Sequence, residues 1–357
     1  MRITEIKYEL VHIHEKELFK LALAEIDTAE SVYVKIITDS GICGYGEGTP
    51  FAPVTGETGS TVIHAIQMFI PALIGMDPGD LATIHAKMNS ILRYNTAAKC
   101  AIDLALYDIM GKAKELPLYK LLGGTDNRLV TDVTLGMGTP EHMADKAADW
   151  VSQGYRILKV KAGLDKDHDA AALTMIRERV GPNVKIRVDL NQSSGVQGTL
   201  DRLPLFKRLK IEAVEQPCPY WDLDGMSELK QKMEGITLIA DESLSDEHDI
   251  VRIAKHRAAD IVNIKLMKCG GLFPAQRANA IAAAEGIQCM VGCMFEDRIA
   301  ITAAMSLVAS SSNIIEADCD SFLLSDAVSI PVTGGFENIG EKIQLLDQPG
   351  LGITVDF

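Results

Sequence analysis

The sequence contains no run of about 18 consecutive apolar residues, so it predicts no membrane-spanning helix. Its first residues, M-R-I-T-E-I-K-Y-E-L, alternate as a β-strand does and lack the apolar core of a signal peptide. The seven cysteines follow no spacing typical of a disulfide framework or a zinc site, and we interpret them as reduced thiols. These absences together predict a cytoplasmic location.

Basic residues are outnumbered, because 35 Lys and Arg face 49 Asp and Glu, which gives a net charge of −14. A protein neutralises phosphate groups with clusters of lysine and arginine, so this charge argues against nucleic acid and an anionic membrane as partners. We interpret the charge as a contribution to solubility. The 357 residues, of which 47% are hydrophobic and 24% charged, are enough for a large core and two domains.

The first 125 residues predict an α+β domain. Residues 3–11 and 31–38 alternate between apolar and polar, and the second run turns at Asp39-Ser40-Gly41 into residues 42–47, which predicts an antiparallel sheet. Residues 14–30, between these strands, are expected to form a loop. Residues 60–125 are expected to be helical, because residues 99–114 show helical periodicity and a glycine stop follows at residues 122–124.

Beyond about residue 126 the pattern changes to a strand–helix repeat. Short apolar runs predict strands at residues 129–135, 157–160, 184–188, 211–214, 236–240, 261–264, 289–291 and 313–316. Parallel strands that alternate with helices over about 200 residues are typical of a closed barrel, with an open, doubly wound sheet as the alternative. We predict a barrel over residues 126–324 and a C-terminal segment, residues 325–357, that returns to pack on the first domain.

Three acids close consecutive apolar runs at equal intervals of 26 residues: Asp189, Glu215 and Asp241. Because the strand C-termini of a parallel barrel open on one face, these carboxylates are expected to converge. A single acid after a strand is usually a helix N-cap or a solvated loop residue, but the regular spacing favours a shared site. Three hard oxygen ligands without a nearby histidine or cysteine favour Mg²⁺, and Asn191 is placed to orient a ligand or a bound water molecule.

Lysines end the flanking strands. Strand alternation puts Lys159 and Lys161 on one side, expected to face inward, and Lys265 ends a later strand. The alternative is an exposed loop lysine, but a lysine at the end of a buried strand is costly unless it is paired. Near a cation and other ammonium groups the pKa of a lysine is expected to fall, which suits the lysine to act as a base.

These stretches resemble motifs of the enolase superfamily, in its muconate-lactonising branch: K-V-K at residues 159–161, V-D-L-N at 188–191, E-Q-P at 215–217, D-E-S at 241–243 and I-K-L-M-K-C-G-G at 264–271. The resemblance runs nearly end to end. It implies an α/β fold, a modified TIM barrel, (β/α)7β, with an α+β capping domain formed by the N-terminal region and the C-terminal segment. Relatives often form symmetric assemblies, so a homo-oligomer is expected by analogy.

The resemblance also implies a chemistry. One Mg²⁺ per subunit is held by Asp189, Glu215 and Asp241, and the Mg²⁺ in turn holds the carboxylate of the substrate. Lys161 and Lys265 are then the catalytic acid/base residues that remove and return an α-proton on opposite faces. Lys159 is expected to give electrostatic support.

The end of the eighth predicted strand distinguishes the branches of this family. Asp318 and Asp320 resemble the D-x-D pair with which dipeptide epimerases bind the α-ammonium group of the substrate, and paired acidic oxygens suit such a group. The alternative interpretation is a loop that caps a helix. The resemblance implies an isomerase, a dipeptide epimerase that inverts the α-carbon of the C-terminal residue of a small-molecule dipeptide.

Other functions stay open within the superfamily: an N-acylamino acid racemase or o-succinylbenzoate synthase, and a muconate cycloisomerase. Substrates of the first two carry no free α-ammonium group, which leaves Asp318 and Asp320 without a role. A barrel retained only for binding would have a damaged metal triad or a lost lysine, whereas all five positions are present.

Substrate contacts are further expected at Phe19, Ala24, Thr134, Glu296 and Asp297. Enzymes of this branch that are specific for Ala-Glu carry an arginine where this sequence has Ala24, so Ala24→Arg is expected to raise activity on Ala-Glu. The surrounding segment is mostly apolar, while Glu25 and Asp297 would favour a cationic side chain. We therefore expect a hydrophobic or cationic dipeptide rather than Ala-Glu.

Overall fold

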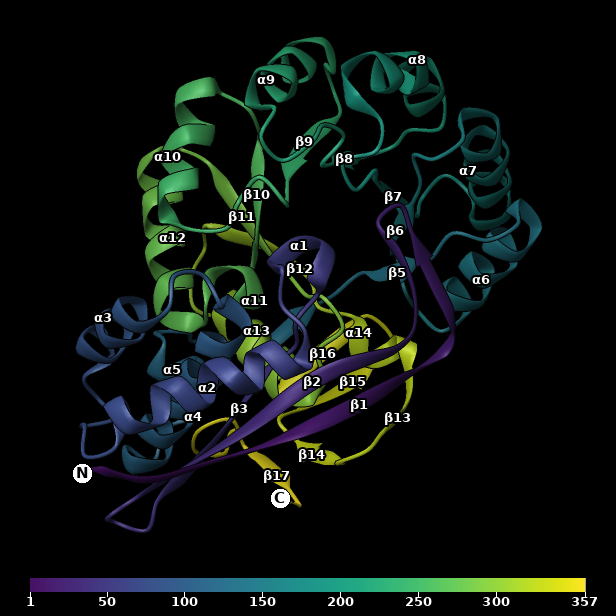
Figure 1. The fold of residues 1–357 in the computed structure, drawn as a ribbon. Coiled ribbons are helices and arrows are strands. Elements are labelled where there is room, and N and C mark those ends of the chain that lie inside the picture. Colours follow the sequence, from purple (N-terminus) through teal and green to yellow (C-terminus); the bar gives the residue numbers. More distant parts are fainter. Residues whose placement is uncertain (357) are drawn as a thin grey trace.

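The computed structural model describes residues 1–356 as a β-rich capping region packed on a barrel of parallel strands (Figure 1). The barrel strands lie in the order β5 to β12 without any reversal, which confirms the predicted barrel and excludes a doubly wound sheet. No helix within residues 1–356 is long and apolar enough to cross a membrane.

The capping region combines a four-stranded antiparallel sheet with helices. Its strands are β1 (Ile3–Leu21), β2 (Ala24–Thr38), β3 (Cys43–Gly48) and β13 (Ser325–Val328), in the order β13-β1-β2-β3. Its helices are α1 (Ala52–Thr55), α2 (Gly59–Leu73), α3 (Leu81–Ile91), α4 (Thr96–Ala113) and α5 (Leu118–Leu121).

Helix α4 packs directly on strand β3 because small residues face each other there. Every second residue of β3 is a glycine, and a Cβ on Gly46 would lie 1.9 Å from the carbonyl oxygen of Ala101 in α4. Ala97 and Ala105 lie one turn to either side and are also fully buried. This close approach removes nearly all of α4 from water and fixes the capping helices on the sheet.

Strands β1 and β2 form one long hairpin, so the prediction of a loop over residues 14–30 is wrong. The two strands pair from Ile3 opposite Thr38 to Leu21 opposite Ala24, with a register shift between His14 and Phe19. The shift interrupts the alternation of apolar and polar residues, and the charged residues around it hid the strand from the sequence pattern. Figure 1 shows the outer half of this hairpin reaching the ends of β5 to β7.

The barrel alternates strands and helices. Its strands are β5 (Val133–Leu135), β6 (Ile157–Lys161), β7 (Lys185–Asp189), β8 (Ala213–Glu215), β9 (Thr237–Ala240), β10 (Ile261–Lys265), β11 (Gln288–Gly292) and β12 (Ile314–Asp318). Its helices are α6 (Pro140–Ser152), α7 (Lys166–Val180), α8 (Gly195–Arg208), α9 (Leu223–Lys232), α10 (Glu247–His256), α11 (Leu266–Cys269), α12 (Leu272–Ala284), α13 (Arg298–Val308) and α14 (Ser321–Leu324).

The barrel closes at a seam between β5 and β12, which share no ladder among the described residues. Hydrogen bonds bridge the seam from the Cys319 N–H to Thr131 Oγ1 (3.1 Å) and from the Asp132 N–H to the Ala317 carbonyl (3.4 Å). The single strand predicted at residues 129–135 is wrong, because the chain breaks there into β4 (Arg128–Val130) and β5.

The C-terminal segment returns to the rest of the molecule. Strand β13 pairs with β1, and β16 (Lys342–Leu345) pairs with both β4 and β15 (Phe336–Ile339). Strands β14 (Val332–Gly334) and β17 (Ile353–Val355) form a further pair. The division of the chain at residues 125 and 324 stays a prediction.

Arg187 in β7 joins the barrel interior to the seam. Its guanidinium lies 2.8 Å from Glu316 in β12, 3.3 Å from Asp132 and 3.4 Å from Glu212. The side chain is only 2% exposed, so these ion pairs are sheltered from water. Arg187 therefore connects segments that the backbone ladder leaves unjoined.

We expect Arg187→Met to lower the free energy of unfolding by about 3–5 kcal/mol, because the buried carboxyl of Asp132 loses its cationic partner. Urea denaturation measures this change. The matched control is Arg252→Met, since the Arg252 side chain is 59% exposed and its ion pair with Asp249 is expected to contribute less than about 1 kcal/mol. Equal losses in the two variants would contradict a structural role of Arg187.

Candidate active site

The three predicted acids lie side by side at the strand ends. In the parallel ladder Lys161 is opposite Asp189 and Asp189 is opposite Glu215, while Asp241 follows the last residue of β9. All three carboxyl groups are buried, and one oxygen of each lies within 4.8 Å of the others. The structure thus brings together the residues that the spacing of 26 predicted to converge.

Tight turns after β7 and β8 aim these acids inward. Asn191, Gln192 and Gln216 all have positive φ values, of 37°, 69° and 36°, which are uncommon outside glycine. The Gln216 side chain accepts hydrogen bonds from the N–H groups of Asp241 (2.8 Å) and Ser243 (3.1 Å). These bonds tie the end of β8 to the end of β9 and so hold Asp241 beside Glu215.

The lysines surround the acids. Lys159 Nζ lies 2.7 Å from Asp318, 2.9 Å from Glu215 and 3.2 Å from Asp189. Lys161 Nζ lies 2.7 Å from Asp189, and Lys265 Nζ lies 2.9 Å from Asp241. Lys161 ends β6 and Lys265 ends β10, so these two lysines stand on opposite walls of the eight-stranded barrel.

The electrostatics of the lysines differ from the expectation of a lowered pKa. Burial lowers the pKa of Lys265, but the charge of Asp241 outweighs this effect and holds the pKa above its ordinary range. The pKa of Lys159 is raised in the same way by Asp318 and Glu215. A fall of these pKa values therefore requires a further positive charge among the acids.

Three polar residues that the sequence did not single out complete the site. Lys268 in α11 is buried and lies 2.5 Å from Asp241, Glu242 accepts a hydrogen bond from Asn191 (3.2 Å), and Asn263 donates one to Glu215 (3.0 Å). The absence of a side chain at Gly292 leaves the room that the Asn263 amide occupies. The I-K-x-x-K spacing was the available signal for Lys268, because three residues are close to one helical turn.

The acids fit a hard divalent cation. Glu215 Oε2 accepts no hydrogen bond from the described residues, although Lys159 Nζ lies 2.9 Å away, and Asn191 Oδ1 is likewise without a donor. Burial and the neighbouring carboxylates raise the pKa of Glu215 to about 8 despite Lys159. Converging carboxylate oxygens with unused acceptor capacity match the ligands that Mg²⁺ prefers.

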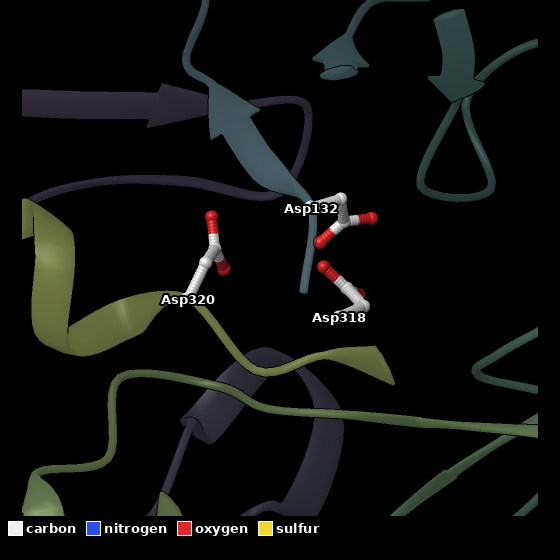
Figure 2. A group of neighbouring side chains, drawn as sticks. All are labelled: Asp132, Asp318 and Asp320. Carbon is white, nitrogen blue, oxygen red and sulfur yellow. The ribbon is translucent and has the colours of Figure 1, made fainter. Parts of the chain in front are cut away.

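A second acidic group lies at the seam. Figure 2 shows the carboxyl groups of Asp132 and Asp318 pointing toward one another, with Asp320 beside them. Asp320 accepts a hydrogen bond from the Thr134 N–H (2.5 Å) and makes no capping bond to α14, which argues against the interpretation of this pair as a helix cap. Burial, and then the charge of Asp318, raise the pKa of Asp320 to about 6.

A cavity of about 50 Å³ opens onto the lysines and acids. Its polar wall includes Thr134, Asn191, Asp318 and Asp320 as well as Lys159, Lys161, Asp241 and Lys265. Much of its apolar wall comes from the capping region: Phe19, Leu21, Leu23, Phe51 and Val54. The barrel adds Met294, Phe295 and Leu324. The predicted site residues Phe19 and Thr134 are therefore on the wall.

Three of the expected substrate contacts do not lie on the wall of this cavity. Ala24 pairs with Leu21 at the hairpin turn and is not on the cavity wall, where Leu21 and Leu23 stand instead. Glu296 turns back to accept a hydrogen bond from the Met294 N–H, and Asp297 accepts one from the Tyr33 hydroxyl (2.7 Å). Both acids are buried inside the protein and do not line the cavity.

Asp297 belongs instead to a junction between the capping sheet and the barrel. Glu47 in β3 accepts hydrogen bonds from the N–H groups of Asp297 (2.7 Å) and Ala300 (2.9 Å) at the start of α13. Burial, and then the charge of Asp297, raise the pKa of Glu47 from 4.5 to about 8. The protonated form of Glu47 is thus favoured in the folded state.

This junction predicts a pH dependence of stability. Because the folded pKa of Glu47 (about 8) lies above the unfolded value of 4.5, its contribution is complete below pH 4.5 and is lost as the pH rises to about 8. We expect the free energy of unfolding to fall more steeply over this range in the wild type than in Glu47→Gln, by on the order of a few kcal/mol. Urea denaturation at several pH values measures both slopes, and equal slopes would exclude this role of Glu47.

Comparisons with known proteins match the whole chain. The family described as "Mandelate racemase / muconate lactonizing enzyme, N-terminal domain" matches residues 5–123, and "Enolase C-terminal domain-like" matches residues 142–357. The hydrophobic dipeptide epimerase of Enterococcus faecalis is 41% identical over 99% of this chain and 100% of its own. A crystal structure of dipeptide epimerase from that organism, complexed with Mg and L-Leu-L-Tyr, has a TM-score of 0.96 at 40% identity and covers 99% and 100% of the two chains.

Other relatives are similar over the same length. The L-Ala-D/L-Glu epimerase of Clostridium acetobutylicum is 37% identical over 99% of both chains. The N-succinyl-L-Arg/Lys racemase of Bacillus cereus is 36% identical over 100% of this chain and 96% of its own. Family matches of this extent confirm the resemblance of the motifs, and the chain belongs to the enolase superfamily, in the group of mandelate racemase and muconate lactonising enzyme.

Proposed function

We propose that this chain is a Mg²⁺-dependent dipeptide epimerase, an isomerase that inverts the α-carbon of the C-terminal residue of apolar dipeptides. The observation that carries this proposal is the composition of one cavity. Its wall combines lysines on opposite sides, Asp241 from the three converging acids, the pair Asp318 and Asp320, and apolar side chains of the hairpin. Each of these groups can bind or act on one part of a dipeptide.

Asp189, Glu215 and Asp241 would hold one Mg²⁺, with Asn191 orienting the Asp189 carboxylate through a 2.9 Å bond from its N–H. When bound, Mg²⁺ supplies positive charge beside the substrate carboxylate, where negative charge develops in the reaction. Gln216 and Lys268 hold Asp241 in position for this role.

Lys161 and Lys265 would act as the acid and base. The unprotonated Nζ of one lysine takes the α-proton, and the electron pair of the C–H bond moves into the carboxylate to form an enediolate. The ammonium group of the other lysine then donates its proton to the opposite face of the same carbon. Because the two lysines stand on opposite walls, this exchange inverts the stereocentre. Lys159 keeps positive charge beside Asp189 and Glu215 during the reaction.

Asp318 and Asp320 would bind the α-ammonium group of the substrate. Lys159 contacts Oδ2 of Asp318, which leaves Oδ1 of that carboxylate for the ligand. Asp320 accepts a hydrogen bond from the Thr134 N–H at Oδ2 and makes only a long contact of 3.8 Å with the Cys293 thiol at Oδ1. Charge-assisted hydrogen bonds of this kind are about twice as strong as neutral ones. They would orient a dipeptide with its C-terminal carboxylate toward the three acids.

The apolar wall that the hairpin contributes to the cavity favours apolar side chains at the C-terminal residue of the dipeptide. Phe19, Leu21 and Leu23 of the hairpin face the cavity, whereas Lys20 is paired with Glu25 (2.8 Å). Since Asp297 is turned inward and Glu25 is already paired, the acids expected to favour a cationic substrate are not available on the wall. We therefore narrow the substrate class to hydrophobic dipeptides.

The alternative within the family is racemisation of an N-acylamino acid or synthesis of o-succinylbenzoate, and muconate cycloisomerisation is a third possibility. These substrates lack an α-ammonium group. They would place an uncharged acyl group or a ring against Asp318 and Asp320, which is unfavourable for two buried carboxylates.

The first test uses apolar L,L-dipeptides with Mg²⁺ in D₂O. We expect inversion at the C-terminal residue together with a mass increase of one deuteron. Lys161→Met and Lys265→Met are each expected to lower epimerisation by on the order of a thousandfold, because inversion needs both lysines. Each variant should still exchange the α-proton of one stereoisomer through the lysine that remains.

Lys232→Met is the matched control, because Lys232 is exposed on α9 and should leave the rate unchanged. Exchange on an N-succinyl amino acid, with none on any dipeptide, would replace the proposed function with the racemase alternative.

The second test concerns the cation alone. We expect Asp241→Asn to weaken Mg²⁺ binding by more than about tenfold in isothermal titration calorimetry, because one of three anionic ligands is lost. Asp224→Asn is the matched control, since that aspartate is exposed on α9 and pairs only with His256. An unchanged dissociation constant in Asp241→Asn would show that the cation binds elsewhere.

A further inference from the structure

A second, larger cavity lies beside the reaction site. Its volume is about 320 Å³, and it lies between the outer half of the β1–β2 hairpin, the segment after β5, helix α6 and helix α14. The cavity at the lysines measures only about 50 Å³, which is room for a few water molecules at roughly 10–15 Å³ each. Most of the space near the reacting centre therefore lies in this second cavity.

The two cavities adjoin. Phe19, Thr134 and Leu324 are on the wall of both, so no further layer of side chains separates them. Phe19 packs edge-on against Phe295, with ring centroids 5.8 Å apart, and this contact fixes the partition between the two spaces. A ligand that passed these three residues would enter the larger cavity.

The geometry determines which end of a dipeptide would face the larger cavity. Thr134, on the shared wall, donates its N–H to Asp320, and Asp320 and Asp318 would bind the α-ammonium group. The side chain of the N-terminal residue is attached to the same carbon as that ammonium group. It would therefore begin close to the shared wall at Thr134.

The lining of the larger cavity is apolar inside and charged at the rim. Leu135, Met137, Met143, Trp150 and Leu323 form the inner wall. At the rim, Glu17 lies 3.2 Å from Lys146 and 3.5 Å from His142, so these charges are paired and exposed. Two methionines in the wall suit side chains of several shapes, because methionine adapts to irregular contacts.

We propose that this cavity is the subsite for the side chain of the N-terminal residue, and that it selects large apolar side chains there. This inference rests on the proposed function and extends it from the C-terminal to the N-terminal residue. Small N-terminal residues would leave the cavity unfilled, so their dipeptides are expected to be poorer substrates.

One acidic residue, Glu15, would favour a cationic rather than an apolar side chain in the larger cavity. It lines the larger cavity, and its Oε2 has no hydrogen-bond partner among the described residues. Its carboxyl group lies close to Asp320, and burial together with the charge of Asp320 raises the pKa of Glu15 to about 7. Glu15 thus lies at the end of the cavity near Asp320 rather than among the apolar side chains. If Glu15 determined the specificity, dipeptides with lysine or arginine as the N-terminal residue would be preferred.

The test compares dipeptides that share one C-terminal residue and carry Gly, Ala, Leu, Phe or Lys at the N-terminus. For the wild type we expect kcat/KM to be roughly tenfold higher with Leu or Phe than with Gly. Met137→Trp fills the cavity and is expected to reduce the Leu-to-Gly ratio of kcat/KM by roughly tenfold, mainly through KM. Met137→Ala enlarges the cavity and should raise the Phe-to-Leu ratio roughly threefold, which keeps the test valid if the tryptophan variant does not fold.

Met68→Trp is the matched control, because Met68 is exposed on α2, far from both cavities, and should leave every ratio unchanged. Wild-type activity that is independent of the N-terminal residue, ratios that do not move in either Met137 variant, or a preference for Lys over Leu would each overturn the subsite. The absence of epimerisation with every dipeptide would instead overturn the proposed function, so the two failures are distinguishable.

Discussion

Ion pairs between buried lysines and buried carboxylates hold the mouth of the barrel together. A charge taken out of water is strongly unfavourable unless an opposite charge lies close by, and here each of Lys159, Lys161, Lys265 and Lys268 has at least one carboxylate within 3 Å. The ladder register sets these distances, because it places Lys161, Asp189 and Glu215 in one row. The same crowding leaves carboxylate oxygens free for a cation, so structural stability and proposed chemistry have one origin.

Much of this centre could be predicted from the sequence, because the strand–helix repeat converts equal spacing into spatial convergence. Asp189, Glu215 and Asp241 follow that rule, and the structure brings them together with the predicted lysines. Lys268 and Asn263 were missed because their roles depend on contacts within α11 and across the barrel that no repeat encodes. Asp132 was missed because it lies at a break between strands rather than at a strand end.

The residues of the apolar cavity wall were harder to predict, for a physical reason. They lie on the hairpin, where the register shift near His14 moves each following side chain relative to a regular strand. A position such as Ala24 therefore cannot be placed on the cavity wall by counting from a motif, and the structure puts Leu21 and Leu23 there. The acids after β11 also lie away from this wall, since α13 begins at once after Asp297 and the Asp297 side chain bonds to Tyr33 of the capping sheet.

The seam between β5 and β12, where no ladder of backbone hydrogen bonds joins the described strands, has a mechanical consequence. Elsewhere around the barrel, main-chain ladders fix the spacing of neighbouring strands, but at this join the spacing depends on a few side chains such as Arg187 and Thr131. Proteins open locally with least cost where few backbone hydrogen bonds and contacts hold neighbouring segments together. The position of Asp318 relative to Thr134 therefore depends on side-chain contacts more than on backbone bonding, and because Asp318 is paired with Lys159, a sequence change at the seam would reach the lysines as well.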